Sequence, residues 1–220
     1  NPNVSALYIP ALEVGGDYYD VIKKSEHELW FIIADVSGKG VNAAFHVAKM
    51  KGIFKALSKT EMDLESFVIK ANDAVCECFE KGVYITAVLM KIDIKNRTIT
   101  WSRSGHCPLI YWDNNNKTKS KIEDKGLGLG ILKSPNFKQH CHINQRKYKE
   151  GDMVILYTDG VIEARNENKE EYGEKRLSAC INTNSTKTAQ TLENTIINDL
   201  KKFIGDQDVF DDITSLIIKL

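Results

Sequence analysis

Apolar and polar residues follow strand spacing near both ends of the chain. An unbroken apolar run from Leu29 to Ala34 is typical of a strand buried on both faces. Val4 to Pro10 alternates weakly, and Pro10 limits its ladder bonds, which is typical of an edge strand. Further strand patterns cover residues 18–22, 84–93, 98–103, 109–112, 141–143, 153–158 and 215–220.

Three stretches instead carry apolar residues at helical spacing. The first covers residues 41–58, and the second follows directly, with Asp63 as its N-cap and Gly82 at its end. The third covers residues 188–204. The chain thus begins with strands, continues with a pair of helices and ends with a strand that returns to the core. This order predicts an α+β fold built in layers.

The turn Ser25-Glu26-His27 joins two of the predicted strands into a hairpin. Antiparallel pairing sets the start of one strand beside the end of the next. We therefore expect Asp17 and Asp35 at the same end of neighbouring strands. The Gly15-Gly16 pair lets the backbone turn tightly before Asp17.

Aspartates stand at the edges of four apolar runs. They are Asp17, Asp35, Asp159 and Asp211, the last in an Asp211-Asp212 pair. A single such residue, for example Asp35, more often caps a turn or a helix. Four of them, far apart in sequence, predict one cluster of hard oxygen ligands for Mg²⁺ or Mn²⁺.

Composition narrows the class of protein. The 220 residues suffice for one buried core, and no linker indicates a second domain. Thirty basic residues balance thirty acidic ones, so no global field favours nucleic acid or an anionic membrane. No apolar run approaches the roughly 20 residues that cross a bilayer. Five cysteines without framework spacing indicate reduced thiols and a cytoplasmic protein.

Five segments together resemble one known family. In order they read GGDYYD, ADVSGKG, SGHCPLIYW, YTDGVIEA and DDITSLII. They are similar to the metal-dependent protein serine/threonine phosphatases of type 2C, and within these to the SpoIIE-like branch of sporulation and stress-response regulators. The resemblance runs from Ser5 to Leu220. It implies a four-layer α-β-β-α sandwich, with two mostly antiparallel sheets face to face and helices on both outer sides.

The resemblance also implies a site that holds two Mn²⁺ or Mg²⁺ ions. Asp35 would bridge both ions, and Asp17 and the backbone carbonyl of Val36 would serve one of them. Asp159 and Asp211 would hold the other. The attacking group would be a metal-bound water, with no side-chain nucleophile.

The remaining candidates are supporting residues. Asp20, Asp212 and Gly160 stand beside the expected ligands, and the choice between Asp211 and Asp212 stays open. The basic residue that holds phosphate in eukaryotic members has no clear match here. Lys39 is a candidate substitute, with a solvated loop lysine as the alternative.

The histidines carry weaker signals. We expect His106, in the SGHCP segment, to pack or bond near the core, with a supporting role at the site left open. His140 and His142 are expected at the surface.

The resemblance implies hydrolysis of phosphoserine or phosphothreonine on a regulatory protein similar to the antagonists of anti-sigma factors. A non-catalytic signalling module of the same fold and a hydrolase of small phosphorylated molecules are the alternatives. We expect residues 1–220 to form a single domain, the C-terminal part of a longer regulatory protein with an upstream sensor domain. That protein would lie in the cytoplasm or at the cytoplasmic face of a membrane receptor, without nucleic acid or membrane insertion, and a homodimer stays open.

Overall fold

The computed structural model describes residues 2–220, which divide into two compact units. Unit 1 holds residues 2–13, 107–122 and 149–220, and unit 2 holds residues 14–106 and 123–148. Each unit has one five-stranded sheet in which every strand pair is antiparallel. Two antiparallel sheets with helices confirm the α+β class.

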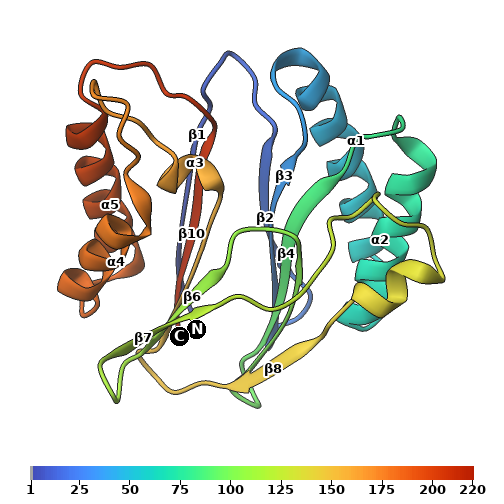
Figure 1. Cartoon of the computed structure of the whole chain (residues 1–220). Coiled ribbons are helices and arrows are strands. Elements are labelled where there is room, and N and C mark those ends of the chain that lie inside the picture. Colours follow the sequence, from blue (N-terminus) through green and yellow to red (C-terminus); the bar gives the residue numbers. More distant parts are fainter. Residues whose placement is uncertain (1) are drawn as a thin grey trace. The chain divides into compact units, whose positions relative to one another are not determined.

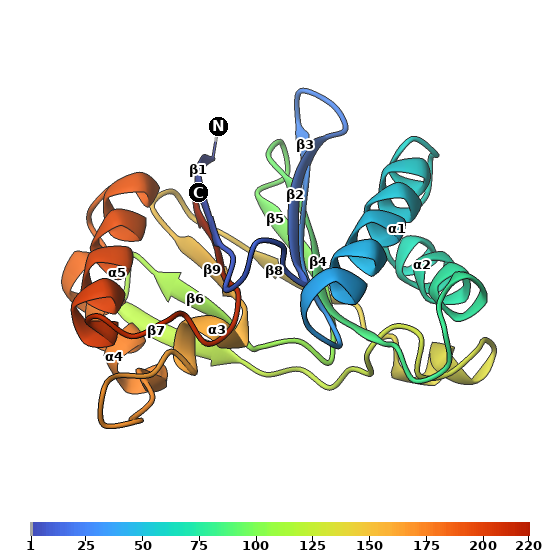
Figure 2. The same cartoon turned by 90° about the horizontal axis from the view of Figure 1, so that it is seen from above.

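The sheet of unit 2 has the order β2-β3-β4-β5-β8. Its strands are β2 (Asp17–Lys23), β3 (Glu28–Val36), β4 (Ile85–Asp93), β5 (Thr98–Ser104) and β8 (Asn144–Lys147). Two helices, α1 (Gly40–Ser58) and α2 (Leu64–Cys78), lie along one face of this sheet, and the short 3₁₀ helix η1 (Asn136–His140) follows at their side (Figures 1 and 2).

Alternate residues of β3 face the two helices. Ile32, Ala34 and Val36 are buried in one cluster with Phe54 of α1 and Phe67 of α2. The residues between them therefore point to the opposite face. Phe31 and Ile33 on that face are also fully buried, as the uninterrupted apolar run predicts.

The sheet of unit 1 has the order β1-β10-β9-β6-β7. Its strands are β1 (Asn3–Ile9), β6 (Leu109–Asp113), β7 (Thr118–Ile122), β9 (Met153–Tyr157) and β10 (Ile213–Lys219). Helices α4 (Gly173–Asn184) and α5 (Ala189–Ile204) cover one face of it, and the single turn of α3 (Asp159–Ile162) follows β9 (Figure 1). Apolar residues of α5, β9 and β10 form the core of this unit.

Most predicted elements are present within one or two residues. The hairpin of β2 and β3 is confirmed, and Asp63 caps α2 by accepting a hydrogen bond from the Ser66 N–H at 2.8 Å. The strand expected at residues 141–143 is wrong, because the 3₁₀ turn of η1 occupies the preceding residues and pairing begins only at Asn144. Gly82 does not end α2, which stops at Cys78.

No helix within residues 2–220 has the length and apolarity needed to cross a membrane.

Candidate functional site

Asp17 and Asp35 stand directly opposite each other on β2 and β3. Their neighbours Tyr18 and Ala34 point into the helix-facing core, so both carboxylates lie on the other face of the sheet. Asp17 is only 6% exposed, and Asp35 is half-buried. Two like charges in directly opposed positions destabilise a sheet unless something neutralises them.

Gly16 packs closely beside this pair. A Cβ atom at Gly16 would lie 3.1 Å from the Val36 carbonyl oxygen and 3.5 Å from Oδ1 of Asp35. The backbone is fixed there, because the N–H of Val36 donates to the carbonyl of Gly16 at 3.1 Å. Unit 2 thus gathers two carboxylates and one carbonyl, the hard oxygen donors that suit Mg²⁺ or Mn²⁺.

A second acidic group lies in unit 1, where the turn after β9 packs on the segment before β10. A Cβ atom at Gly160 would lie 2.0 Å from the carbonyl oxygen of Asp212 and 3.2 Å from that of Asp211. The Thr158 N–H also donates to the carbonyl of Thr214 at 3.0 Å. Only glycine fits at position 160. Because it has no Cβ atom, the turn after β9 packs directly on the backbone of Asp211 and Asp212.

The pKa of Glu163 is affected by the negative charge of this second group. Burial raises the pKa of its carboxyl above the ordinary value, and the nearby carboxylates of Asp159, Glu171 and Asp211 raise it further. Asp159 and Asp211 therefore act on the same carboxyl. A concentration of negative charge of this kind favours a bound cation.

Asp211 and Asp212 have different surroundings. Asp212 is 6% exposed, and its Oδ1 accepts a hydrogen bond from the Ala11 N–H at 2.8 Å. Its carbonyl also lies against Gly160. Asp211 is half-buried, and its Oδ1 accepts from the N–H of Asp212 at 2.9 Å.

Within residues 2–220, no group of three or more His, Cys, Asp or Glu side chains is arranged around one metal position. Each unit, taken by itself, holds two aspartates with backbone oxygens nearby. A family model described as Stage II sporulation protein E (SpoIIE) matches residues 25–220. The chain belongs to the SpoIIE family.

A curated relative extends this result along the chain. The phosphoserine phosphatase RsbU of Bacillus subtilis (strain 168) is 29% identical over 218 residues, which cover 99% of this chain and 63% of RsbU. The chain thus spans less than two thirds of that relative's length. The resemblance to the SpoIIE-like branch is confirmed.

Solved structures share the fold. The SiaA-PP2C domain of Pseudomonas aeruginosa matches with a TM-score of 0.85 at 16% identity, over 99% of this chain and 85% of that one. The catalytic domain of the serine threonine protein phosphatase PstP, solved in complex with two manganese ions, matches with a TM-score of 0.65 at 14% identity, over 99% and 97% of the two chains.

One of the candidate residues in this SpoIIE-family chain, Asp20, takes another position than the one expected. Asp20 lies on the helix-facing side of β2, where it contacts Lys55 of α1 at 2.6 Å and accepts a hydrogen bond from the Tyr18 hydroxyl at 2.9 Å. It does not share a face with Asp17, so a supporting place beside that ligand does not fit. Lys39 is exposed and directly precedes α1.

Three histidines were candidates for the site or its surface, and one of them contacts a threonine of β4. His140 and His142 are exposed, as expected. His106 is buried, and its Nδ1 lies 2.8 Å from the hydroxyl of Thr86 on β4. Sequence reasoning named neither Thr86 nor Glu163. Both follow only from strand register and from packing.

Proposed function

We propose that this SpoIIE-family chain is a metal-dependent phosphatase that hydrolyses phosphoserine or phosphothreonine on a regulatory protein. The observation that carries the proposal is the opposed pair of Asp17 and Asp35 beside the Val36 carbonyl. The family match and the relative named phosphoserine phosphatase support the reaction class.

The proposed ligands come from both acidic groups. Asp17 and the Val36 carbonyl would hold one divalent ion, Asp159 and Asp211 would hold the other, and Asp35 would serve both. When bound there, Mn²⁺ or Mg²⁺ would supply the activation of a water and the neutralisation of charge on the phosphoryl oxygens. The donors are all oxygen, which suits these two metals and not a thiolate-binding one.

Other residues hold this arrangement in place. Asp212 ties the segment before β10 to residue Ala11 through its carboxylate, which supports Asp211 as the ligand. Gly160 keeps the backbone of Asp159 close to Asp211. Lys39, exposed at the start of α1, is the proposed cation for the substrate phosphate, and no side chain of the chain acts as nucleophile.

The proposed substrate is a phosphorylated regulatory protein in the cytoplasm, with control by an upstream domain of a longer chain. The homologous RsbU carries the name phosphoserine phosphatase, and a mycobacterial structure that shares the fold joins RsbU and RsbW domains. Both support a role in signalling between regulatory proteins.

The test uses metal binding and hydrolysis together. We expect Mn²⁺-dependent release of phosphate from a phosphoprotein, and its loss in Asp17→Asn, Asp35→Asn and Asp159→Asn. In chelator the unfolding midpoint of these variants should be no lower than that of wild type, because each removes a charge that repels its neighbours. Asp20→Asn is the matched control, because it removes a carboxylate from the same strand but from the opposite face. It should retain Mn²⁺ binding, measured by calorimetry.

Two outcomes separate the alternatives. Mn²⁺ binding without hydrolysis of any phosphoester indicates the non-catalytic module. Full activity of all three ligand variants in the presence of chelator rules out the metal-dependent mechanism.

A further inference from the structure

Thr86 of β4 stands directly opposite Asp35 of β3. Asp17, Asp35 and Thr86 thus form one row across three neighbouring strands. The residues on either side of Thr86, Ile85 and Ala87, belong to the helix-facing core. The Thr86 side chain therefore points to the same face as the two carboxylates.

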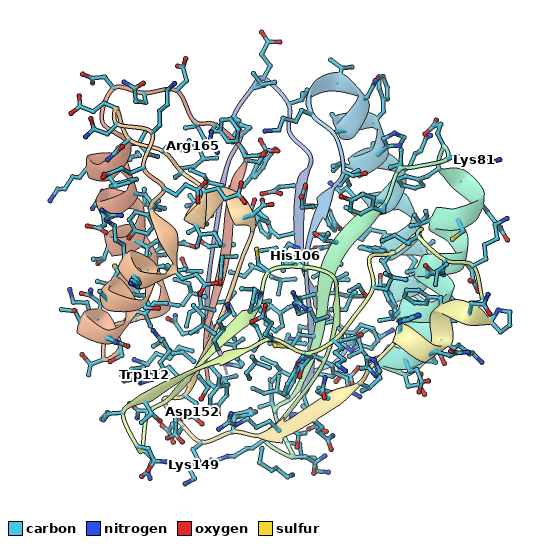
Figure 3. The ribbon with its side chains drawn as sticks, viewed as in Figure 1. Lys81, His106, Trp112, Lys149, Asp152 and Arg165 are labelled. Atoms are coloured by element: carbon cyan, nitrogen blue, oxygen red, sulfur yellow. The ribbon has the colours of Figure 1, made fainter. Side chains whose placement is uncertain are left out.

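His106 continues this row on the next segment of the sheet. Gly105 pairs with Ala87 of β4 in an isolated bridge, which fixes the backbone just before His106. The imidazole is 3% exposed, and its Nδ1 lies 2.8 Å from Oγ1 of Thr86. Figure 3 labels His106 where the chain leaves β5 for β6.

We infer that Thr86 and His106 are positioning residues that orient the carboxylate of Asp35, an inference that rests on the proposed metal-dependent function. The step from His106 to Asp35 passes through the threonine hydroxyl. In the tautomer that carries its proton on Nδ1, the imidazole donates to Oγ1 of Thr86, and the Thr86 hydroxyl keeps its own proton for another acceptor. The side chain directly opposite Thr86 is the Asp35 carboxylate, and opposed side chains in an antiparallel sheet have Cβ atoms about 4.5–5.5 Å apart.

The physical consequence concerns metal affinity. A carboxylate ligand that is held by a hydrogen bond has fewer orientations to lose when it binds an ion. Removal of such an outer partner typically lowers metal affinity about 10–100-fold. Thr86 and His106 do not themselves bind the ion in this scheme. Their loss should therefore weaken binding without abolishing it.

The experiment measures Mn²⁺ binding by electron paramagnetic resonance, which counts free Mn²⁺ and needs no substrate. Thr86→Val keeps the shape of the side chain and removes the hydroxyl, whereas Thr86→Ser keeps the hydroxyl. We expect Thr86→Val to raise the Kd for Mn²⁺ about 10–100-fold and Thr86→Ser to restore it. Thr100→Val is the matched control, because Thr100 pairs with Lys91 at the other end of β4.

Substitutions of His106 test the second step. His106→Leu should raise the Kd for Mn²⁺ as Thr86→Val does. His106→Asn places an amide near the former Nδ1 position, so it should restore part of the affinity. The double variant Thr86→Val, His106→Leu should bind Mn²⁺ no more weakly than the weaker single variant, because both act through one hydroxyl.

The outcomes distinguish this inference from the proposed function. If the wild-type chain binds Mn²⁺ and the folded Thr86→Val and His106→Leu variants bind it equally well, the positioning role is wrong and the metal-dependent function stands. If the wild-type chain binds no Mn²⁺, both are wrong. Should Thr86→Val fail to fold, Thr86→Ala compared with Thr86→Ser, and His106→Leu compared with His106→Asn, decide the question by the same measurement.

Discussion

Replacement of Gly160 and of Gly52 by alanine should change the free energy of unfolding in opposite directions. At Gly160 the new Cβ would lie 2.0 Å from the backbone oxygen of Asp212. We expect Gly160→Ala to lower the free energy of unfolding by about 1–3 kcal/mol, the usual cost of inserting an atom into a packed site. It should also weaken Mn²⁺ binding, because Asp159 and Asp211 move apart.

Gly52 is the matched control for this substitution. It lies at an exposed position in the middle of α1, and a Cβ atom there would meet no atom within 4 Å. Gly52→Ala should raise the free energy of unfolding by roughly 0.5–1 kcal/mol, because alanine loses less backbone entropy in a helix. Urea unfolding of both variants checks the prediction, and equal signs would contradict it.

The hairpin predicts which carboxylates are paired, and alternation along the strand predicts the face on which each one lies. Asp17 and Asp35 are paired as the hairpin predicts. Asp20 was expected beside them, yet it lies three residues after Asp17 and so points to the opposite face. Alternation along the strand was enough to exclude it. Thr86 needed the register of β4 against β3, which no local pattern contains.

At the scale of elements, Glu193 of α5 connects the helix to the sheet of unit 1. It is 2% exposed, and it accepts hydrogen bonds from the hydroxyls of Ser5 on β1 and Ser215 on β10. Burial raises the pKa of this carboxyl above its ordinary value of 4.5, and the two hydroxyls oppose part of that shift. The folded state therefore holds the proton more tightly than the unfolded chain does.

A pH dependence of stability follows from this difference. The contribution of Glu193 is fully present below pH 4.5 and is lost as the pH rises through the raised pKa. Glu193→Gln stays neutral, so its free energy of unfolding relative to wild type should increase from pH 4 towards neutral pH. Paired urea unfolding curves across this range measure it. Glu150→Gln, at an exposed position, serves as control. If the free energy of unfolding of Glu193→Gln relative to wild type does not change with pH, the prediction is wrong.

The elements that sequence reasoning missed lack a strong apolar pattern. The strand β7 reads TKSKI and is mostly exposed, and it lies at the edge of its sheet. The helix α4 has three buried residues in a polar sequence: Leu177, Ile181 and Asn184. In contrast, α5 buries six residues on one stripe and was found within one residue of its start. Tertiary packing, and not local propensity, stabilises the two weak elements.

At the scale of the whole molecule, the balance of charge bears on the substrate. Thirty basic and thirty acidic residues give no net field that would steer a small polyanion to the chain. A protein substrate can instead supply binding energy from contacts remote from its phosphate. Val41 and Phe45 are large apolar side chains one helical turn apart on α1, and they are 63% and 65% exposed. Ala43 between them lies against Gly16, beside the proposed ligand Asp35.

We therefore expect a folded phosphoprotein to have a much higher kcat/KM than a short phosphopeptide or a nucleotide, at one fixed Mn²⁺ concentration. Phe45→Ser should reduce kcat/KM for the phosphoprotein and leave that for p-nitrophenyl phosphate unchanged, since the small ester is too short to reach the helix. Tyr8→Ser, in unit 1, is the control for loss of an exposed apolar side chain. If a nucleotide or sugar phosphate has a kcat/KM equal to that of every phosphoprotein tried, the chain is a small-molecule hydrolase and not a protein phosphatase. Contacts remote from the phosphate would then contribute nothing to the transition state.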